Sequence, residues 1–283
     1  MVRELDLDLA DGKTLHAYDA RGDDAKRVGA QHLAVFWHHG TPNIGAPPAP
    51  LFAAADRLGL RWVSYDRPGY GGSSPQPGRD VASAARFTAT VADALGIERF
   101  AVMGHSGGAP HALACSAGLP ERVVAAVSVA ALAPFGADGL DWFAGMIPSG
   151  VAALRAAAAG RAAKEQFDAS GAEYDPEFTE ADLAALTGDW SWFADVVGPA
   201  VATGRGGAVD DDLAYVAPWG FEPAAVTAPT LLLHGGADGI APSAHSAWLA
   251  RHCPAAELRL SPPDGHISIL NHATAALEWL RTR

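Results

Sequence analysis

The sequence predicts an α/β protein: a parallel sheet with helices on both faces, interrupted by a purely helical segment. Short apolar runs, typical of buried strands, alternate with helical segments through most of the 283 residues. Between residues 136 and 218 this alternation stops and only helical signals remain. Because 49% of the residues are hydrophobic, the chain has enough apolar surface for a large core.

The first part of the chain begins as a hairpin and continues as strand–helix units. Leucines alternate with acidic residues over 5–9, Asp11-Gly12 predicts a turn, and residues 14–18 extend again. Asp80 is a candidate N-cap for a helix that runs to Leu95. The other expected elements are strands at Leu33–Trp37, Arg61–Tyr65, Phe100–Met103 and Val123–Val129, and helices at Leu51–Arg57 and Ala109–Ala117.

The second part contains the helical insertion and the end of the core. In the insertion we expect helices at Ala152–Phe167, Glu180–Leu186 and Trp192–Ala202, punctuated by glycines. Alternation then resumes with a strand at Thr230–His234, a helix at Ala244–His252, a strand at Leu258–Leu260 and a helix at Ile267–Arg281. The predicted organisation is an α/β core at 1–135 and 219–283, with a helical cap or lid at 136–218.

Charge excludes two classes of partner. The formal net charge is −12, and residues 136–218 hold 14 acidic against 4 basic residues. Such a surface repels phosphate backbones and anionic lipids, so we expect neither nucleic-acid nor membrane binding. The longest apolar run, near residues 123–135, is too short to span a bilayer.

Cysteine usage and the N-terminus predict a cytoplasmic protein. Cys115 and Cys253 are far apart and lack metal-ligand spacing, so we expect reduced, structural thiols. The first residues are charged where a signal peptide would be apolar. We expect a monomer or homodimer that binds a small acyl substrate and uses no metal and no organic cofactor.

The main chemical motif is Gly104-His105-Ser106-Gly107-Gly108, a G-x-S-x-G pattern. A strand is predicted to end at Met103 and a helix to begin near Ala109, which is the setting that a nucleophile elbow requires. Such a tight turn strains the backbone at Ser106, and side chains at Gly104 or Gly108 would collide with the neighbouring strand and helix. The motif therefore predicts Ser106 as a nucleophile.

Three further motifs occur in order along the chain. They are His39-Gly40-Thr41-Pro42 after an early strand, Tyr65-Asp66-Arg67-Pro68-Gly69-Tyr70-Gly71 after the next, and a late pair, His234-Gly235-Gly236-Ala237-Asp238 with Asp264-Gly265-His266. Together with the elbow, they make nearly the whole chain resemble the α/β-hydrolase fold family. The resemblance implies an eight-stranded, mostly parallel sheet, an inserted helical cap and a catalytic order of Ser, Asp, His.

The mechanism that this resemblance implies needs a base and an acid beside Ser106. His266 is the candidate base, because a serine hydroxyl is a poor nucleophile until its proton is removed. Asp238, after the strand that ends at His234, is our choice for the carboxylate that orients the imidazole. Asp264 and Asp138 are the rivals. Asp264 looks like a turn residue, and some family members place the acid at the position of Asp138.

An acyl-transfer site also needs donors for the oxyanion. The backbone N–H of Gly107 is one candidate, and the family pattern assigns the other to the N–H of Thr41. Whether the Thr41 hydroxyl adds a third donor is left open. We expect the loop from Asp66 to Tyr70 to be scaffolding, with Asp66 and Arg67 paired to neighbouring loops.

The cap is where we expect substrate choice to be set. Most of its aromatic rings are expected to join the lid helices to each other and to the core. The alternative is that some of them line an acyl pocket, whose candidate residues are His105, Trp142, Trp190, Trp192 and Trp219. The run Asp210-Asp211-Asp212 is expected to be a solvated helix cap, with reception of a substrate ammonium group as the alternative.

The sequence therefore predicts a serine hydrolase that cleaves a carboxylic ester or similar small acyl compound through an acyl-Ser106 intermediate. Cofactor-free haloperoxidases and perhydrolases remain alternatives, since they share the triad. A prolyl-aminopeptidase type is a weaker one, because GHSGG and HGTPN depart from its usual GGSWG and HGGPG motifs. A ligand-binding protein on a hydrolase fold is the non-enzymatic alternative.

Overall fold

The computed structural model describes residues 2–20, 32–202 and 204–283, and its centre is an eight-stranded sheet. The strand order is β1-β2-β4-β3-β5-β6-β7-β8. The first hairpin is antiparallel and joins β4 in antiparallel fashion, whereas every other pairing is parallel. The bounds are β1 (Val2–Asp8), β2 (Thr14–Ala20), β3 (Leu33–His38), β4 (Leu60–Tyr65), β5 (Phe100–His105), β6 (Val123–Val129), β7 (Thr230–Gly235) and β8 (Ala256–Ser261).

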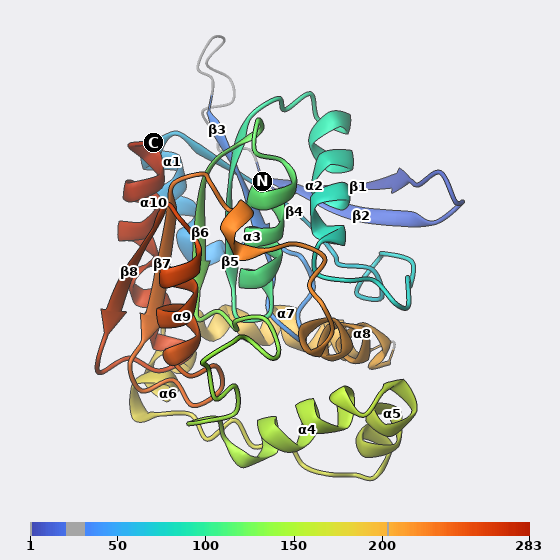
Figure 1. Cartoon of the computed structure of the whole chain (residues 1–283). Helices are drawn as coiled ribbons and strands as arrows, with labels where there is room; N and C mark the ends of the chain where they lie inside the picture. Colours follow the sequence, from blue (N-terminus) through green and yellow to red (C-terminus); the bar gives the residue numbers. More distant parts are fainter. Residues whose placement is uncertain (1, 21–31, 203) are drawn as a thin grey trace.

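Helices cover both faces of the sheet, as parallel strands require (Figure 1). Residues of α1 and α10 join one hydrophobic cluster, and residues of α2, α3 and α9 join the other. Alternate residues of β3 point to opposite clusters: Phe36 to the second and Trp37 to the first. The helices are α1 (Phe52–Leu58), α2 (Ser83–Ala94), α3 (Gly108–Gly118), α9 (Ala244–His252) and α10 (Ala273–Arg281), with 3-10 turns η2 (Ala49–Leu51), η4 (Pro223–Ala225) and η5 (Ser268–His272).

The inserted cap lies between β6 and β7 and is helical in its regular structure, as far as the described residues extend. Figure 1 shows it at the lower end of the sheet, where the parallel strands finish. Its elements are α4 (Pro148–Ala158), α5 (Arg161–Ala169), α6 (Glu180–Thr187), η3 (Asp189–Trp192), α7 (Phe193–Ala202) and α8 (Gly206–Val216). The predicted fold class is confirmed, and the cap covers the sheet edge where sites form in α/β proteins.

Two expectations within the cap are wrong. The single helix predicted at Ala152–Phe167 is two helices, α4 and α5, which separate at Gly160, where φ is 104°. The run Asp210–Asp212 is not a solvated cap: it lies inside α8, and Asp210 and Asp211 are buried. The reason is that Gly207, without a side chain, packs directly against the backbone of Gly69 and brings α8 onto the core.

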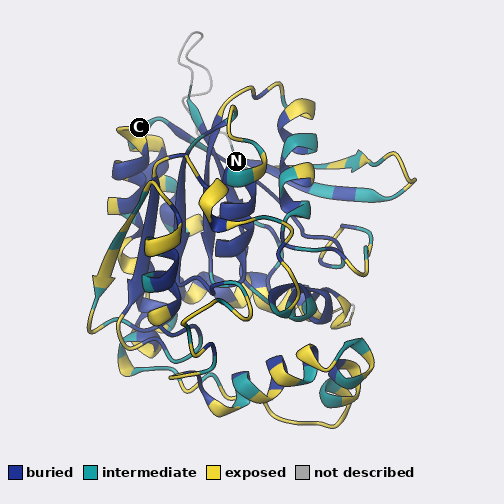
Figure 2. Cartoon of the chain, in the orientation of Figure 1, coloured by how far each residue is buried: buried dark blue, intermediate teal, exposed yellow. Residues whose placement is uncertain are grey.

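Burial follows the layers of the fold. Figure 2 shows the sheet and the helix faces that contact it buried, with exposed residues on the outer helix faces and along β1. Within the described ranges, no helix has the length and apolar character needed to cross a bilayer.

Candidate active site

The turn that carries Ser106 connects β5 to α3. Ser106 has a φ of 55°, in the left-handed region that residues other than glycine rarely adopt. A Cβ atom on Gly104 would overlap the backbone of Gly108, and one on Gly108 would overlap the carbonyl group of His38. The close approach of strand and helix therefore requires both glycines, as the motif predicts, and it exposes the Ser106 hydroxyl above the sheet.

Ser106, His266 and Asp238 form one hydrogen-bonded chain. The Ser106 Oγ lies 2.8 Å from His266 Nε2, and His266 Nδ1 lies 2.8 Å from Asp238 Oδ2. Each residue follows the carboxyl end of a parallel strand, β5, β7 or β8, and these ends share one edge of the sheet. In this arrangement the hydroxyl donates to Nε2 while the Nδ1–H donates to the carboxylate.

Both oxygens of the Asp238 carboxylate have polar partners. Its Oδ1 accepts the backbone N–H groups of Ile240 and Ala241, each at 2.9 Å. Its Oδ2 also lies 3.3 Å from Nε2 of the buried His234. Burial raises the pKa of Asp238, but the interactions with His266 and His234 more than offset it, so the pKa is well below its ordinary value. The carboxylate is ionised and fixed toward the imidazole.

Neither rival acid contacts His266. The Asp264 carboxylate accepts the Ser261 hydroxyl at 2.5 Å and lies 2.9 Å from His272 Nε2. Asp138 is exposed, and its backbone carbonyl accepts the Trp248 indole N–H. The geometry therefore favours Asp238 as the partner of the imidazole.

The two predicted oxyanion residues, Thr41 and Gly107, lie close together and line the same cavity as Ser106. The Thr41 hydroxyl is not a spare donor, because it donates to Asp211 Oδ2 at 2.5 Å. The Tyr215 hydroxyl lies 2.7 Å from Thr41 Oγ1 and 3.1 Å from the carbonyl oxygen of Gly107. Tyr215 thus bridges both residues whose backbone amides would face an oxyanion.

A buried cluster joins this loop to the cap through Asp211. One Asp211 oxygen accepts Arg67 Nε at 3.1 Å and Arg79 Nη2 at 2.6 Å. The other accepts Arg67 Nη2 at 2.6 Å and the Tyr70 hydroxyl at 2.8 Å, beside the Thr41 hydroxyl. Burial raises the pKa of Asp211, but the two guanidinium groups hold it well below its ordinary value. One cap carboxylate therefore fixes the loop that carries Thr41.

The expected pairing of the loop from Asp66 to Tyr70 needs one correction. Asp66 does contact neighbouring loops, through the backbone N–H groups of Gly45 and Gly72. The charge of Arg67 pairs with Asp211 of a cap helix, because Gly207 of α8 packs directly against Gly69 of the loop. The sequence analysis did not single out Tyr215 and placed Asp211 in a run expected to be solvated. Gly207, Asp211 and Tyr215 follow one another at intervals of four residues, which places them on one face of α8, and this spacing is the signal that could have indicated their shared contact.

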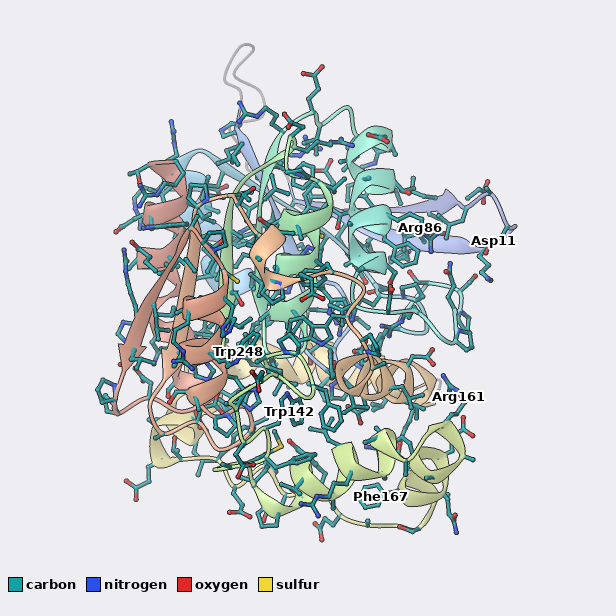
Figure 3. The ribbon with its side chains drawn as sticks, viewed as in Figure 1. Asp11, Arg86, Trp142, Arg161, Phe167 and Trp248 are labelled. Atoms are coloured by element: carbon teal, nitrogen blue, oxygen red, sulfur yellow. The ribbon has the colours of Figure 1, made fainter. Side chains whose placement is uncertain are left out.

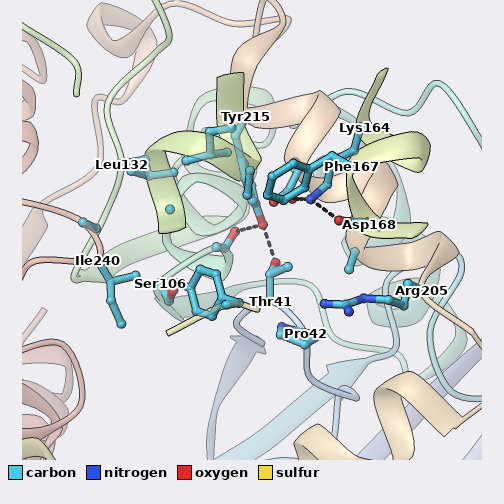
Figure 4. Close-up of a pocket in the computed structure, with 18 of the residues that line it drawn as sticks. Thr41, Pro42, Ser106, Leu132, Lys164, Phe167, Asp168, Arg205, Tyr215 and Ile240 are labelled. Carbon is cyan, nitrogen blue, oxygen red and sulfur yellow. Dashed lines mark hydrogen bonds and ion pairs between the residues drawn. The ribbon is translucent and has the colours of Figure 1, made fainter. Parts of the chain in front are cut away.

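Two cavities meet at Ser106, and Figure 4 shows the smaller of them. The smaller, about 170 Å³, lies among α4, α5 and α8. The larger, about 710 Å³, is walled by Phe178, Leu186, Phe193 and Val197 of the cap and also contacts His266. Thr41, Ser106, Tyr174, Arg205 and Ile240 are among the residues that line both. The cap therefore divides the space over Ser106 into a smaller branch and a larger, more apolar branch.

An ion-paired group lines the smaller branch. Lys164 Nζ lies 2.9 Å from Asp168 Oδ1 and 2.8 Å from Asp212 Oδ2, joining α5 to α8 (Figure 4). Burial lowers the pKa of Lys164, but the two carboxylates raise it above its ordinary value overall. In the part of the chain that the structure describes, no group of three or more His, Cys, Asp or Glu side chains is arranged to hold a metal ion.

His105 contacts the backbone and ring of His266 and lines the larger cavity. Its Nε2–H donates to the carbonyl oxygen of His266 at 2.9 Å, and its ring packs against the His266 and Phe193 rings. Burial and, to a smaller extent, His266 lower the pKa of His105 to about 3, so this ring is neutral.

Four tryptophans proposed for the pocket line neither cavity at Ser106: Trp142, Trp190, Trp192 and Trp219. Instead they are buried in the two hydrophobic clusters. The Trp142 indole donates to the carbonyl of Ala133 and lies near α9 (Figure 3), and the Trp190 indole donates to Asn271. The pocket alternative is wrong for these four, because large rings gain more by joining cap to core.

Comparison with known proteins agrees with this fold. A sequence model described as alpha/beta hydrolase fold matches residues 34–273. Similar solved structures include a thermophilic esterase from Thermogutta terrifontis (TM-score 0.69, 21% identity, 99% of this chain and 98% of that one) and the enol-lactonase from Burkholderia xenovorans LB400 (TM-score 0.69, 21% identity, 98% of each). A bromoperoxidase from Bacillus anthracis is similar at a TM-score of 0.70 and 18% identity, covering 100% of this chain and 98% of that one.

The structural similarity covers nearly the whole chain, including the cap. At sequence identities of 21% or less, it establishes the fold and not the substrate. The family match extends from β3 to the first residue of α10 and includes the elbow and both late motifs. The chain belongs to the α/β-hydrolase fold family.

Proposed function

We propose that this protein is a serine hydrolase that cleaves a carboxylic ester or a similar small acyl compound. The observation that carries the proposal is the chain of two 2.8 Å hydrogen bonds from Ser106 through His266 to Asp238. A serine that donates to an imidazole oriented by an ionised carboxylate is the arrangement that acyl transfer needs.

The proposed reaction has two halves. The Ser106 Oγ attacks the substrate carbonyl carbon while His266 Nε2 takes the hydroxyl proton, and the resulting oxyanion accepts the backbone N–H groups of Thr41 and Gly107. The intermediate collapses, the bond to the leaving group breaks, and His266 returns the proton to the departing oxygen. A water molecule, deprotonated by His266, then attacks the acyl-Ser106 ester, and collapse releases the acid and the free serine. Asp238 stabilises the imidazolium in both halves.

The test of this function is active-site labelling. A fluorophosphonate should add once to Ser106, as measured by intact mass and peptide mapping, and should not add to Ser106→Ala or to heat-unfolded wild-type protein. Ser106→Ala should also lose hydrolysis of p-nitrophenyl esters while keeping the wild-type unfolding midpoint. Labelling at another residue, or unchanged turnover in Ser106→Ala, would refute the proposal.

The two cavities predict how acyl length affects turnover. We expect the acyl chain to enter the larger, apolar cavity, because each buried CH₂ group contributes about 0.8 kcal/mol. In a p-nitrophenyl series from acetate to laurate, kcat/KM should rise to an optimum. Val197→Trp, which narrows the larger cavity, should move that optimum to shorter chains. Ala153→Phe, which narrows the smaller cavity, is the matched control and should leave it in place. The opposite pattern would place the acyl chain in the smaller cavity.

Perhydrolysis is a second candidate, favoured by the structural similarity to a bromoperoxidase. The same acyl-serine would then be attacked by hydrogen peroxide in place of water and would give a peracid. Peracid formation that competes with hydrolysis at millimolar peroxide distinguishes this activity from simple ester hydrolysis.

A further inference from the structure

Asp182 is a buried cap residue that the proposed reaction does not yet use. It stands in the first turn of α6, where its backbone N–H donates to the Thr179 hydroxyl at 3.1 Å. Its carboxylate accepts the Thr179 backbone N–H at 3.3 Å, which completes a capping box. Taken alone, this would be an ordinary helix N-terminus.

The same carboxylate also crosses from the cap to the core. Its Oδ1 accepts the backbone N–H groups of Ile267 and Ser268, both at 2.8 Å, and its Oδ2 accepts that of His266 at 3.3 Å. A Cβ atom on Gly265 would overlap this carboxylate, so the glycine of Asp264-Gly265-His266 is what admits it. Asp182 therefore caps two helix starts at once, α6 and η5.

These contacts restrain the segment that presents the imidazole. Successive N–H groups at a helix start need acceptors, and one carboxylate here binds three from His266 to Ser268. Burial raises the pKa of Asp182, but these hydrogen bonds hold it below its ordinary value. The imidazole must meet Ser106 and Asp238 simultaneously at 2.8 Å, which leaves little freedom for its backbone.

We propose that Asp182 is a positioning residue: it holds the His266 backbone so that the imidazole reaches both Ser106 and Asp238, and the cap thereby helps to assemble the catalytic site. This inference rests on the proposed function, since the value of the imidazole's position lies in acyl transfer. In this view the cap contributes to catalysis in addition to enclosing the substrate.

The primary test is Asp182→Asn, which keeps the size but replaces one acceptor oxygen with a donor. Misplacement of a catalytic group by about 1 Å costs about 10²-fold in rate. We therefore expect kcat for ester hydrolysis and the maximal rate of fluorophosphonate addition to fall by about this factor, with KM nearly unchanged. If Asp182→Asn does not fold, Asp182→Ser, which removes the carboxylate without adding a misplaced amide donor, should give the same pattern.

Two control variants distinguish a loss of His266 positioning from a general weakening of the contacts between the cap and the core. Trp190→Phe removes a different hydrogen bond between the cap and η5, the one to Asn271, without touching the His266 backbone. Glu180→Gln removes an exposed charge from the same turn of α6. Both should keep kcat close to wild type. A loss in Trp190→Phe equal to that in Asp182→Asn, or an unchanged kcat in Asp182→Asn, would overturn the proposal.

An NMR measurement, which does not depend on turnover, tests the positioning role separately from the proposed hydrolysis. In protein with ¹⁵N-labelled histidine, the His266 Nδ1–H that donates to Asp238 should give a far-downfield proton resonance, which His266→Gln identifies by its loss. Asp182→Asn should weaken or shift that resonance, and Trp190→Phe should not. If wild-type protein shows this pattern but does not react with fluorophosphonates, the proposed hydrolysis fails while the positioning role stands. An unaltered resonance in Asp182→Asn refutes the positioning role.

Discussion

Asp238→Asn is expected to lower kcat for ester hydrolysis by about 10⁴-fold without unfolding the protein. The buried carboxylate is ionised and accepts the Nδ1–H of His266 at 2.8 Å. An asparagine amide can donate to Nδ1 instead, which favours the tautomer that cannot accept the serine proton, and it supplies no charge to stabilise the imidazolium. Its remaining oxygen still accepts from Ile240 and Ala241, so the turn is kept. Steady-state kinetics and an unfolding curve measure the two effects.

Asp264→Asn is the matched control for this variant. Asp264 lies two residues before His266, but its carboxylate contacts Ser261 and His272. We expect Asp264→Asn to retain most of kcat. A large loss in Asp264→Asn together with normal turnover in Asp238→Asn would show that the acid has been misassigned.

Asp211→Asn should produce the largest loss of stability, about 3–5 kcal/mol in the free energy of unfolding. Asp211 is fully buried and pairs with Arg67 and Arg79, whose side chains are also buried. Removing its charge leaves two guanidinium groups without a counterion in a low-dielectric interior. Urea unfolding at pH 7 measures the change. Because the Thr41 hydroxyl donates to the same carboxylate, kcat should fall as well.

The pH dependence of this stability has a definite sign. The pKa of Asp211 is depressed in the folded protein, whereas the pKa of an aspartate in the unfolded chain is about 3.9. The contribution of Asp211 is therefore fully present above the unfolded value and is lost as the pH falls through the folded value. The difference between wild type and Asp211→Asn should be constant near neutrality and shrink below about pH 4. A difference that grew on acidification would contradict the assignment.

Asp93→Asn is the control for a surface charge. Asp93 pairs with Arg122 at 2.7 Å, but its side chain is 70% exposed. Exposed pairs contribute about 0–1 kcal/mol, so this variant should unfold almost as wild type does. Equal effects of Asp93→Asn and Asp211→Asn would mean that the cap cluster adds no stability beyond that of a surface ion pair.

Local sequence patterns were sufficient to predict the core of the fold and to single out the three residues, Ser106, His266 and Asp238, that the structure joins by hydrogen bonds. Continuous apolar runs such as Val123–Val129 predict buried strands because both of their faces are covered by helices. The elbow is equally local, since Gly104 and Gly108 are required by contacts within a few residues and with one neighbouring strand. Ser106, His266 and Asp238 could be anticipated because each follows a strand end, and parallel strands finish at one edge.

The roles of the cap residues could not be read in the same way, because they depend on pairs that are distant in the chain. Asp211 contacts Arg67 across 144 positions, and Asp182 contacts Ile267 across 85. Hydrophobic periodicity indicates which face of a helix is buried, but not which surface that face contacts. For this reason the sequence predicted that the run Asp210–Asp212 would be exposed to solvent. Packing of α6 and α8 against the core made those carboxylates buried partners of the loops that carry Thr41 and His266. The four tryptophans are buried in the hydrophobic clusters and do not line the cavities, since burying a large ring removes much apolar surface from water.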